Sequence, residues 1–428
     1  MKIHFIGIGG IGLSGIARLL KSYGHEISGS DIAETTLTKK LESEGIKVTI
    51  PHSSDAINNQ DLVIYTAVVK DDNPEIIEAN KRGIKTISRR EALKLIVNDK
   101  KVYSVCGAHG KSTTSAILAS ILKDTNALIG AESKDFNSNT RVKDSDILVF
   151  EADESDGSFV DSNPYCAIVT NAEPEHMEFY NYDYDLFYNH YREFLNKAEK
   201  KVVCKDDEFL QNQEGEKVSI NDISNIEYKL VNNLPFMSFK FMNETFEVYG
   251  FGEHIALDAS LAIKAALNEL SLKEIKENLK NYKGIKKRFD ILQNYNDFIV
   301  IDDYAHHPTE IKATLKSAKK FATLRNISKI TAIWQPHKYS RTIDNLDAFI
   351  ECFDGVDELI ILPVWSAGEE KRDIDFENLF KRYNPIFADK IKTTNKEIKV
   401  IKNNQIIKTI NIGLNIGFGA GDITYQLR

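Results

Sequence analysis

The fold of this chain is constrained most by residues 104–114, which read Ser-Val-Cys-Gly-Ala-His-Gly-Lys-Ser-Thr-Thr. An apolar, strand-like run precedes them and a helix-like run follows. Gly107 and Gly110 allow a tight turn whose N–H groups face a phosphate. Lys111 adds a charge for the terminal phosphate oxygens, and Ser112 can reach Mg²⁺. The stretch predicts a phosphate-binding loop, although Val105 stands where the general pattern has its first glycine.

The chain begins with a second strand, glycine turn and helix. The apolar residues 3–6 are followed by Gly-Ile-Gly-Gly-Ile-Gly at 7–12, and residues 13–20 have helical spacing. A second strand then ends at Asp31, about twenty positions after the glycines, as in dinucleotide-binding folds. We therefore expect a Rossmann-like domain at residues 1–98. Alone, this pattern indicates NAD, and a purely structural role for the glycines stays open.

Length and composition restrict the class of protein. A chain of 428 residues predicts two to four domains at roughly 150 residues each. With 42% hydrophobic and 28% charged residues it is expected to be globular. The excess of 63 acidic over 55 basic residues argues against nucleic acid as the main partner. Four scattered cysteines and the absence of a leader or a long apolar run predict a soluble, cytoplasmic protein without membrane partners.

The expected central domain, residues 99–284, places polar residues after three strand-like runs. The first is the phosphate loop, the second ends in Glu-Ala-Asp-Glu-Ser-Asp at 151–156, and the third ends in Asn-Ala-Glu-Pro-Glu-His-Met at 171–177. Carboxyl ends of parallel strands meet at one edge of a sheet. Glu154 and His176 are therefore predicted to hold divalent cations beside the phosphates, while an ordinary loop histidine stays open for His176.

Other parts of the chain are less specific. Short alternating runs at 238–242 and 245–249 are expected to add antiparallel strands to the central sheet. In the expected third domain, residues 285–428, strands at 298–303 and 330–334 each precede a cluster of histidines with charged residues. These clusters predict a recognition surface, with helix capping by the histidines as the alternative.

Seven motifs, in order, resemble those of the Mur ligase family and together cover nearly the whole chain. They are Gly7–Gly12, Gly107–Thr114, Glu151–Asp156, Glu175–Met177, Arg288–Asp290, Asp303–Glu310 and Gln335–Thr342. The resemblance implies an α/β protein of three domains. An N-terminal Rossmann-like domain would bind a UDP-sugar, a central P-loop-type mononucleotide-binding sheet would bind ATP, and a C-terminal Rossmann-like domain would bind an amino acid.

Within the family, the motifs resemble those of the members that add the first amino acid in peptidoglycan assembly. This implies that ATP phosphorylates the lactyl carboxylate of UDP-N-acetylmuramic acid, and that L-alanine attacks the acyl phosphate to form an amide. A carboxylate is a poor electrophile, so phosphate supplies the leaving group, and catalysis needs positioning and charge neutralisation. The resemblance also implies two Mg²⁺ ions. A monomer or weak homodimer is expected.

The resemblance assigns roles to individual residues. Those implied in catalysis are Lys111, Glu154, His176 and Arg288, and the implied metal ligands are Ser112, Glu154 and His176. Those implied to bind ATP are Gly107, Ala108, His109, Gly110, Lys111, Ser112, Thr113, His254, Asp258, Arg288, Asp303 and Tyr304. Those implied to bind the UDP-sugar are Gly9, Gly10, Ile11, Gly12, Ser30, Asp31 and Thr66, the last within the segment 66–68. Those implied to bind the amino acid are His306, Lys338 and Arg341.

The chain departs from the family pattern at four positions. Ala108 replaces a usual threonine, and Lys338 replaces a usual arginine, which keeps the charge but loses bidentate geometry. Ile255 and Asp258 replace two asparagines at a helix start that contacts adenine in the family. We therefore expect weaker amino-acid binding and less discrimination between purine nucleotides.

Three other functions remain open. A nicotinamide dehydrogenase would use the glycine turn at 7–12 but would leave Lys111 and Glu154 unexplained. A catalytically silent relative would bind the UDP-sugar only. A ligase that recycles whole cell-wall peptides shares the first motifs but usually differs around residues 336–341.

Overall fold

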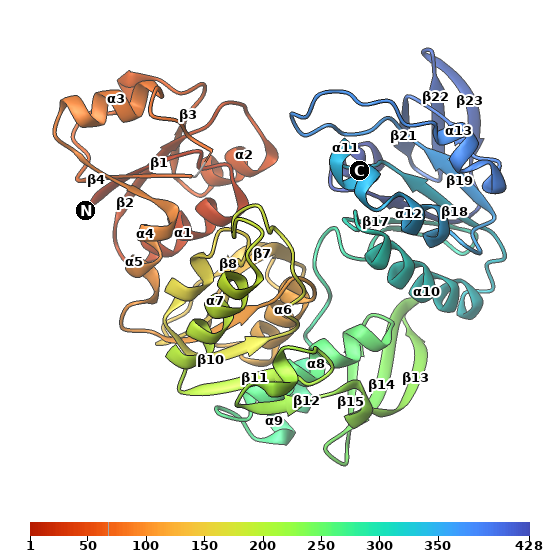
Figure 1. The fold of residues 1–428 in the computed structure, drawn as a ribbon, viewed down its shortest axis with the longest axis horizontal. Coiled ribbons are helices and arrows are strands. Elements are labelled where there is room, and N and C mark those ends of the chain that lie inside the picture. Colours follow the sequence, from red (N-terminus) through yellow and green to blue (C-terminus); the bar gives the residue numbers. More distant parts are fainter. Residues whose placement is uncertain (67) are drawn as a thin grey trace. The chain divides into compact units, whose positions relative to one another are not determined.

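The computed structural model describes residues 1–66 and 68–428; Ala67, in the predicted UDP-sugar segment 66–68, lies outside them. The described residues form two compact units (Figure 1). The first contains residues 1–223 and 256–283, and the second contains residues 224–255 and 284–428. In the described part of the chain, we find no helix with the length and apolar character needed to cross a membrane.

The first unit begins with a five-stranded parallel sheet in the order β3-β2-β1-β4-β5. This order reverses direction between β1 and β4, where ligands bind in doubly wound sheets. The Rossmann-like prediction is confirmed for this sheet. Its strands are β1 (Lys2–Ile6), β2 (Glu26–Ser30), β3 (Lys47–Thr49), β4 (Leu62–Tyr65) and β5 (Lys85–Ser88), and its helices are α1 (Ile11–Ser22), α2 (Thr36–Ser43), α3 (Pro74–Lys81), α4 (Arg89–Ala92) and α5 (Lys94–Val97).

A seven-stranded sheet follows in the order β12-β11-β10-β6-β9-β7-β8. The central strand β6 pairs in parallel with both β9 and β10. The three polar segments predicted to share one edge therefore follow three adjacent strands. The strands are β6 (Lys101–Cys106), β7 (Asn126–Ser133), β8 (Ser138–Arg141), β9 (Ile147–Glu151), β10 (Pro164–Val169), β11 (Lys200–Cys204) and β12 (Glu216–Val218); the helices are α6 (Lys111–Ile121), α7 (Tyr184–Lys197), α8 (Glu253–Ala266) and α9 (Leu272–Leu279).

The predicted antiparallel additions to this central sheet are wrong. β13 (Ser224–Val231), β14 (Leu234–Phe241) and β15 (Glu244–Tyr249) form a three-stranded sheet of their own, in the second unit. Alternate residues of β14 are buried, so one face of this strand packs against other side chains. Pairing with the edge of the central sheet would not by itself bury that face. Tyr228 and Leu230 of β13 pack against the C-terminal core. The predicted domain boundaries near residues 98 and 284 stay predictions.

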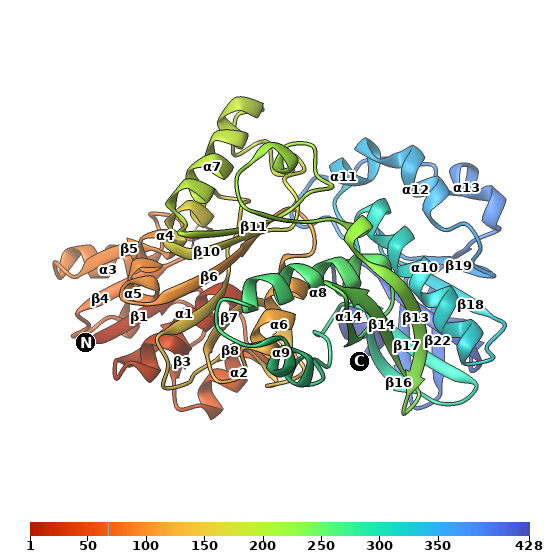
Figure 2. The ribbon, with the colours of Figure 1, turned by 90° about the horizontal axis from the view of Figure 1, so that it is seen from below.

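The C-terminal sheet has the order β16-β17-β24-β18-β19-β20, and all its pairs except β16–β17 are parallel. On one face, α10 (Pro308–Leu324) and α12 (Leu346–Cys352) lie side by side (Figures 1 and 2). The strands are β16 (Asp290–Asn294), β17 (Phe298–Asp303), β18 (Ile330–Trp334), β19 (Glu358–Ile361), β20 (Ile386–Phe387) and β24 (Gly413–Phe418).

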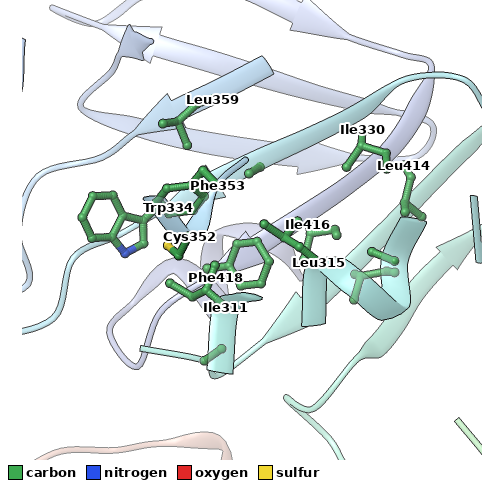
Figure 3. Close-up of a cluster of buried hydrophobic side chains, with 14 of the residues drawn as sticks. Ile311, Leu315, Ile330, Trp334, Cys352, Phe353, Leu359, Leu414, Ile416 and Phe418 are labelled. Atoms are coloured by element: carbon green, nitrogen blue, oxygen red, sulfur yellow. The ribbon is translucent and has the colours of Figure 1, made fainter. Parts of the chain in front are cut away.

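Both faces of the C-terminal sheet are covered by apolar side chains. Figure 3 shows Ile311 of α10 beside Phe418 of β24, within a cluster that also contains Trp334 and Phe353. On the other face, α14 (Ile423–Leu427) and a three-stranded sheet complete a second cluster. That sheet consists of β21 (Lys390–Thr394), β22 (Glu397–Lys402) and β23 (Gln405–Ile410).

The short helices that remain come from both units. They are α11 (Tyr339–Asp344), α13 (Phe376–Leu379), η1 (Ser54–Ala56), η2 (Ser158–Ser162), η3 (Leu210–Asn212), η4 (Ile220–Asp222) and η5 (Lys381–Tyr383).

Candidate active site

The predicted phosphate loop joins β6 to α6. Gly110 caps the helix in the left-handed conformation, at φ 80°. A Cβ atom at Gly110 would lie 2.6 Å from Oδ1 of Asp258, so both the backbone conformation and the space favour glycine. Lys111 is the first residue of α6, and the first helical turn contains no acidic side chain. The N–H groups of such a turn can bind an anion.

The end of β10 holds this loop in place. The backbone N–H of His109 donates to Asn171 at 3.2 Å, and the Asn171 amide donates back to the His109 carbonyl at 2.9 Å. Thr170 donates to the same carbonyl. Sequence reasoning assigned no role to Thr170 or Asn171, although Asn171 begins one of the three polar segments predicted to meet at this edge.

Lys111 makes a buried ion pair with Glu154. Its Nζ lies 2.8 Å and 3.0 Å from the two carboxylate oxygens and also donates to the Gly107 carbonyl at 2.6 Å. The Glu154 side chain is only 2% exposed. Burial alone would lower the pKa of Lys111, but the facing carboxylates of Glu154 and Glu151 raise it. Lys111 is therefore protonated at neutral pH and presents a full positive charge.

Ser112 is paired with Glu151 and not with Glu154, the carboxylate predicted to share a cation with it. The Ser112 hydroxyl donates to Glu151 Oε1 at 2.8 Å, and Gly130 N–H donates to Oε2 at 2.6 Å. Glu151 ends β9, next to β6. A hydroxyl beside a carboxylate suits Mg²⁺, which prefers hard oxygen ligands. Glu151 is thus a candidate that sequence reasoning missed, although it begins the acidic motif.

His176 is set apart from this pair. Its side chain is 39% exposed, and its Nδ1 lies 3.8 Å from Glu178. Over residues 1–66 and 68–428, no group of three or more His, Cys, Asp or Glu side chains is placed to hold a metal by itself. A cation at Ser112 and Glu151 would therefore need further oxygen ligands from phosphate or water.

The N-terminal glycine turn is stabilised by Asp31. Gly9 N–H donates to Asp31 Oδ2 at 2.7 Å, and Ile32 N–H donates to Oδ1 at 2.8 Å. In a dinucleotide-binding site, the acidic residue at this place accepts hydrogen bonds from a ribose. Here both carboxylate oxygens already accept backbone N–H groups, so Asp31 holds the turn.

The Ser30 side chain points into the protein interior. It is fully buried, and its hydroxyl donates to Glu75 and lies 2.8 Å from His52 Nδ1. His4 Nε2 also lies 3.1 Å from Glu75, which belongs to α3. Ser30 therefore belongs to an internal polar network, and the prediction that its side chain contacts the UDP-sugar is not supported by its position.

One cavity of about 350 Å³ lies between the N-terminal glycine turn and Lys111. Gly10, Gly12 and Thr66 line it from the first sheet, and Lys111 and Glu151 line it from the second. The predicted sugar-nucleotide turn and the lysine of the predicted phosphate loop therefore face the same space. The other lining residues are Ile11, Leu13, Ile16, Arg89, Leu93, Leu128, Ile129, Gly130, Phe150 and Asp153.

In the second unit, Arg288 is held in a constrained segment. The neighbouring residues Lys287 and Phe289 have φ angles of 64° and 42°, which are unfavourable for residues other than glycine. Arg288 lies 3.2 Å from Glu310 and over the ring of Tyr304. Such strain is typical of functional sites.

Asp303 supports the same segment. It accepts from Phe289 N–H at 2.9 Å and from Ala305 N–H at 2.8 Å. Burial raises the pKa of Asp303 to about 6, against the opposing effect of Arg288. Its observed contacts anchor the Arg288 segment; the predicted contact with nucleotide stays a prediction.

The predicted amino-acid residues gather near His337, which sequence reasoning did not select. Arg341 Nη1 lies 2.9 Å from His337 Nδ1, and the rings of His306 and His337 are 5.8 Å apart. Burial and then Arg341 lower the pKa of His337 to about 4, so the neutral ring accepts this hydrogen bond. Lys338 has a φ of 66°, and its N–H donates to the Trp365 carbonyl at 2.8 Å.

The residues predicted to contact adenine are divided between the two units. His254 is the second residue of α8 and lies in the second unit, whereas Asp258 lies in the first, against Gly110. Asp258 therefore lies beside the phosphate loop.

Comparison with known proteins gives the family. Three family descriptions match in order: "Mur ligase family, catalytic domain" at residues 2–101, "Mur ligase middle domain" at 105–266 and "Mur ligase, glutamate ligase domain" at 287–411. Their order agrees with the predicted three-domain α/β architecture.

Individual relatives match over the full chain. The UDP-N-acetylmuramate–L-alanine ligase of Campylobacter curvus is 52% identical, covering 100% of this chain and 99% of the relative. That of Helicobacter pylori is 54% identical, covering 100% and 96%.

Solved structures match in the same way. The UDP-N-acetylmuramate-alanine ligase of Thermotoga maritima superposes with a TM-score of 0.83 at 27% identity, covering 100% of this chain and 97% of the other. A murein peptide ligase of Psychrobacter arcticus shares the fold, with a TM-score of 0.65 at 21% identity over 99% and 97%. From these matches, the chain belongs to the Mur ligase family.

Proposed function

We propose that this protein is an ATP-dependent ligase that joins L-alanine to the lactyl carboxylate of UDP-N-acetylmuramic acid in peptidoglycan precursor synthesis. One observation carries the proposal: the glycine turn of the first sheet lines a single cavity together with Lys111, which follows the phosphate loop, and Glu151. Such a cavity can bring a sugar-nucleotide carboxylate next to the terminal phosphate of ATP. The names of relatives with 52–54% identity support the same activity.

In the first step, the carboxylate oxygen attacks the γ-phosphate of ATP and ADP leaves. Lys111, which is protonated, would exchange part of its contact with Glu154 for the phosphate oxygens. The N–H groups of the loop and of the first turn of α6 would bind the other phosphate oxygens. Mg²⁺ held by Ser112 and Glu151 would neutralise phosphate charge. The assignment of His176 to a second ion remains part of the proposal.

In the second step, the amine of L-alanine attacks the acyl carbon and phosphate leaves. Arg341 and Lys338 supply positive charges for the alanine carboxylate. His306 lies beside His337 and would orient the amino acid. Arg288 would stabilise the nucleotide, with Asp303 fixing its backbone.

The alternatives are less well supported. A dehydrogenase would give no role to the buried ion pair of Lys111 with Glu154. A silent relative would have no need of the paired Lys111–Glu154 and Ser112–Glu151. A recycling ligase is opposed by the names of the relatives above 50% identity. A cytoplasmic location, the monomer or weak homodimer, and the lack of nucleic-acid or membrane partners stay predictions.

The direct test is incubation with ATP, Mg²⁺, UDP-N-acetylmuramic acid and L-alanine, with phosphate release and product mass as readouts. We expect one phosphate per amide, and no phosphate when L-alanine or the sugar nucleotide is omitted. Parallel reactions replace L-alanine with glycine, with L-serine or with a cell-wall tripeptide. Amide formation with the tripeptide alone would favour the recycling ligase. UDP-sugar binding without turnover would favour the silent relative.

A further inference from the structure

Arg89 contributes a positive charge to the cavity from the side of the first sheet, and neither the sequence motifs nor the preceding assignments give it a role. It is the first residue of α4, directly after β5. Ser88 and Glu91 form a capping box: Ser88 Oγ accepts from Glu91 N–H, and Glu91 accepts from Ser88 N–H at 2.8 Å. This reciprocal pair fixes the helix start, and thereby the position of Arg89.

The cavity-facing side of this helical segment is defined by two residues one turn apart. Arg89 and Leu93 both line the cavity, as expected for positions i and i+4. Arg90 points elsewhere, because its guanidinium pairs with Asp161 and its side chain is 44% exposed. Neighbouring arginines of the same helix therefore have different surroundings, one in the cavity and one at the surface.

Arg89 lies directly over the N-terminal glycine turn. A Cβ atom at Gly12 would be 3.1 Å from Arg89 Nε. Gly12 and Gly10 line the same cavity. A glycine at position 12 therefore lets the guanidinium approach the backbone of the turn closely, and both face the same cavity, where one anion could contact them.

The electrostatics of the cavity leave Arg89 available. Lys111 is committed to Glu154 at 2.8 Å, whereas the nearest carboxylate to Arg89 is Asp156 at 3.4 Å, with 38% of the Asp156 side chain exposed. The Arg89 side chain is 24% exposed, and a long ion pair that is open to solvent on both sides contributes little free energy, so exchange for a phosphate costs little. Arginine also binds phosphate through two parallel N–H donors.

We propose that Arg89 binds the diphosphate of the UDP-sugar against the glycine turn. The identity of the ligand rests on the proposed function. The glycine turn supplies N–H dipoles, and Arg89 supplies the charge that this diphosphate needs on the first-sheet side of the cavity. The lactyl carboxylate is the other anion of the substrate, and its reaction partner lies on the Lys111 side.

The test compares Arg89→Ala with Arg90→Ala as a matched control. Binding of UDP, UDP-N-acetylglucosamine and UDP-N-acetylmuramic acid is measured by calorimetry, and melting temperatures are recorded for both variants. UDP and UDP-N-acetylglucosamine carry the diphosphate without the lactyl carboxylate. We expect Arg89→Ala to raise all three Kd values by about 10- to 100-fold, because a charge-assisted hydrogen bond is lost. Arg90→Ala should leave them unchanged, and the KM for ATP should not move in either variant.

Two further variants separate binding from a structural role. Arg89→Lys should recover part of the affinity, and Asp156→Asn should retain it, although it removes the same ion pair as Arg89→Ala. Unchanged Kd values in Arg89→Ala would overturn the proposal. The role of Arg89 would then be limited to its ion pair with Asp156. A loss confined to UDP-N-acetylmuramic acid would also overturn it, in favour of the carboxylate. Failure of the unmodified protein to bind any of the three ligands would instead contradict the proposed function and, with it, this site.

Discussion

The Ser112 hydroxyl donates to Glu151 at 2.8 Å, linking the first turn of α6 to the last residue of β9. Glu154, three residues further on, faces Lys111. The two glutamates of one acidic motif therefore have different tasks. Glu151 stands beside the hydroxyl that can bind a cation, and Glu154 fixes the lysine.

This division gives a prediction for magnesium dependence. Glu151→Gln should raise the Mg²⁺ concentration for half-maximal activity by at least about tenfold, since an amide is a weaker cation ligand than a carboxylate. Glu154→Gln is the matched comparison, and its defect should persist at saturating Mg²⁺. Titration of both variants with Mg²⁺ distinguishes them; a larger magnesium shift in Glu154→Gln would reverse the assignment.

Lys111→Ala should nearly abolish amide formation. Loss of a phosphate-binding charge is expected to lower kcat by about two or more orders of magnitude. UDP-sugar binding should be retained within a few-fold, because the glycine turn belongs to the first sheet. Calorimetry and phosphate release measure the two effects, and turnover within about tenfold of the unmodified protein would refute the phosphate-loop assignment.

Arg341→Ala should raise the KM for L-alanine far more than the KM for ATP. An unpaired carboxylate in a closed site costs a few kcal/mol, or about 10- to 100-fold in affinity. Steady-state kinetics with each substrate varied measures the split. If the KM for ATP rises instead, Arg341 belongs to the nucleotide site.

The pH dependence of stability should reveal the half-buried His337. Its pKa is about 4 in the folded protein against an ordinary value of 6.5. Between these values the unfolded chain binds more protons, so the free energy of unfolding falls as pH is lowered from about 6.5 to 4. His337→Asn cannot titrate and should lose less melting temperature across this window. The raised pKa of Asp303 changes the free energy of unfolding with pH in the opposite direction. Because Asp303 is present in both proteins, this contribution cancels when they are compared. Identical pH profiles would show that His337 titrates normally.

The sequence predicted what depends on local pattern. Apolar runs ending in glycine or polar residues predicted the two turns and the shared edge of β6, β9 and β10, because parallel strand ends meet there. The direction of a side chain after a strand ends is not periodic, so Glu151 and Glu154 could not be distinguished. The burial of Ser30 depends on Glu75 in α3, far along the chain. Similarly, apolar and polar residues alternate in β13–β15 as in any sheet with one exposed face. Only tertiary packing determines which domain core the apolar face contacts.

The position of Arg89 was also beyond local pattern. Two consecutive arginines at a helix start look equivalent in sequence, yet one lines the cavity and the other pairs with Asp161. The helix rotates by about 100° between neighbouring residues, and the sequence does not state which direction faces the ligand.

We propose that the lactyl carboxylate is phosphorylated in the cavity that the N-terminal glycine turn and Lys111 both line. UDP-N-acetylmuramic acid labelled with ¹⁸O at both carboxylate oxygens tests it directly, with mass spectrometry of the released phosphate and of the amide. We expect one ¹⁸O in each phosphate and one in each amide carbonyl, since one carboxylate oxygen leaves with the phosphoryl group. Release of unlabelled phosphate during amide formation would contradict an acyl phosphate and the mechanism built on it.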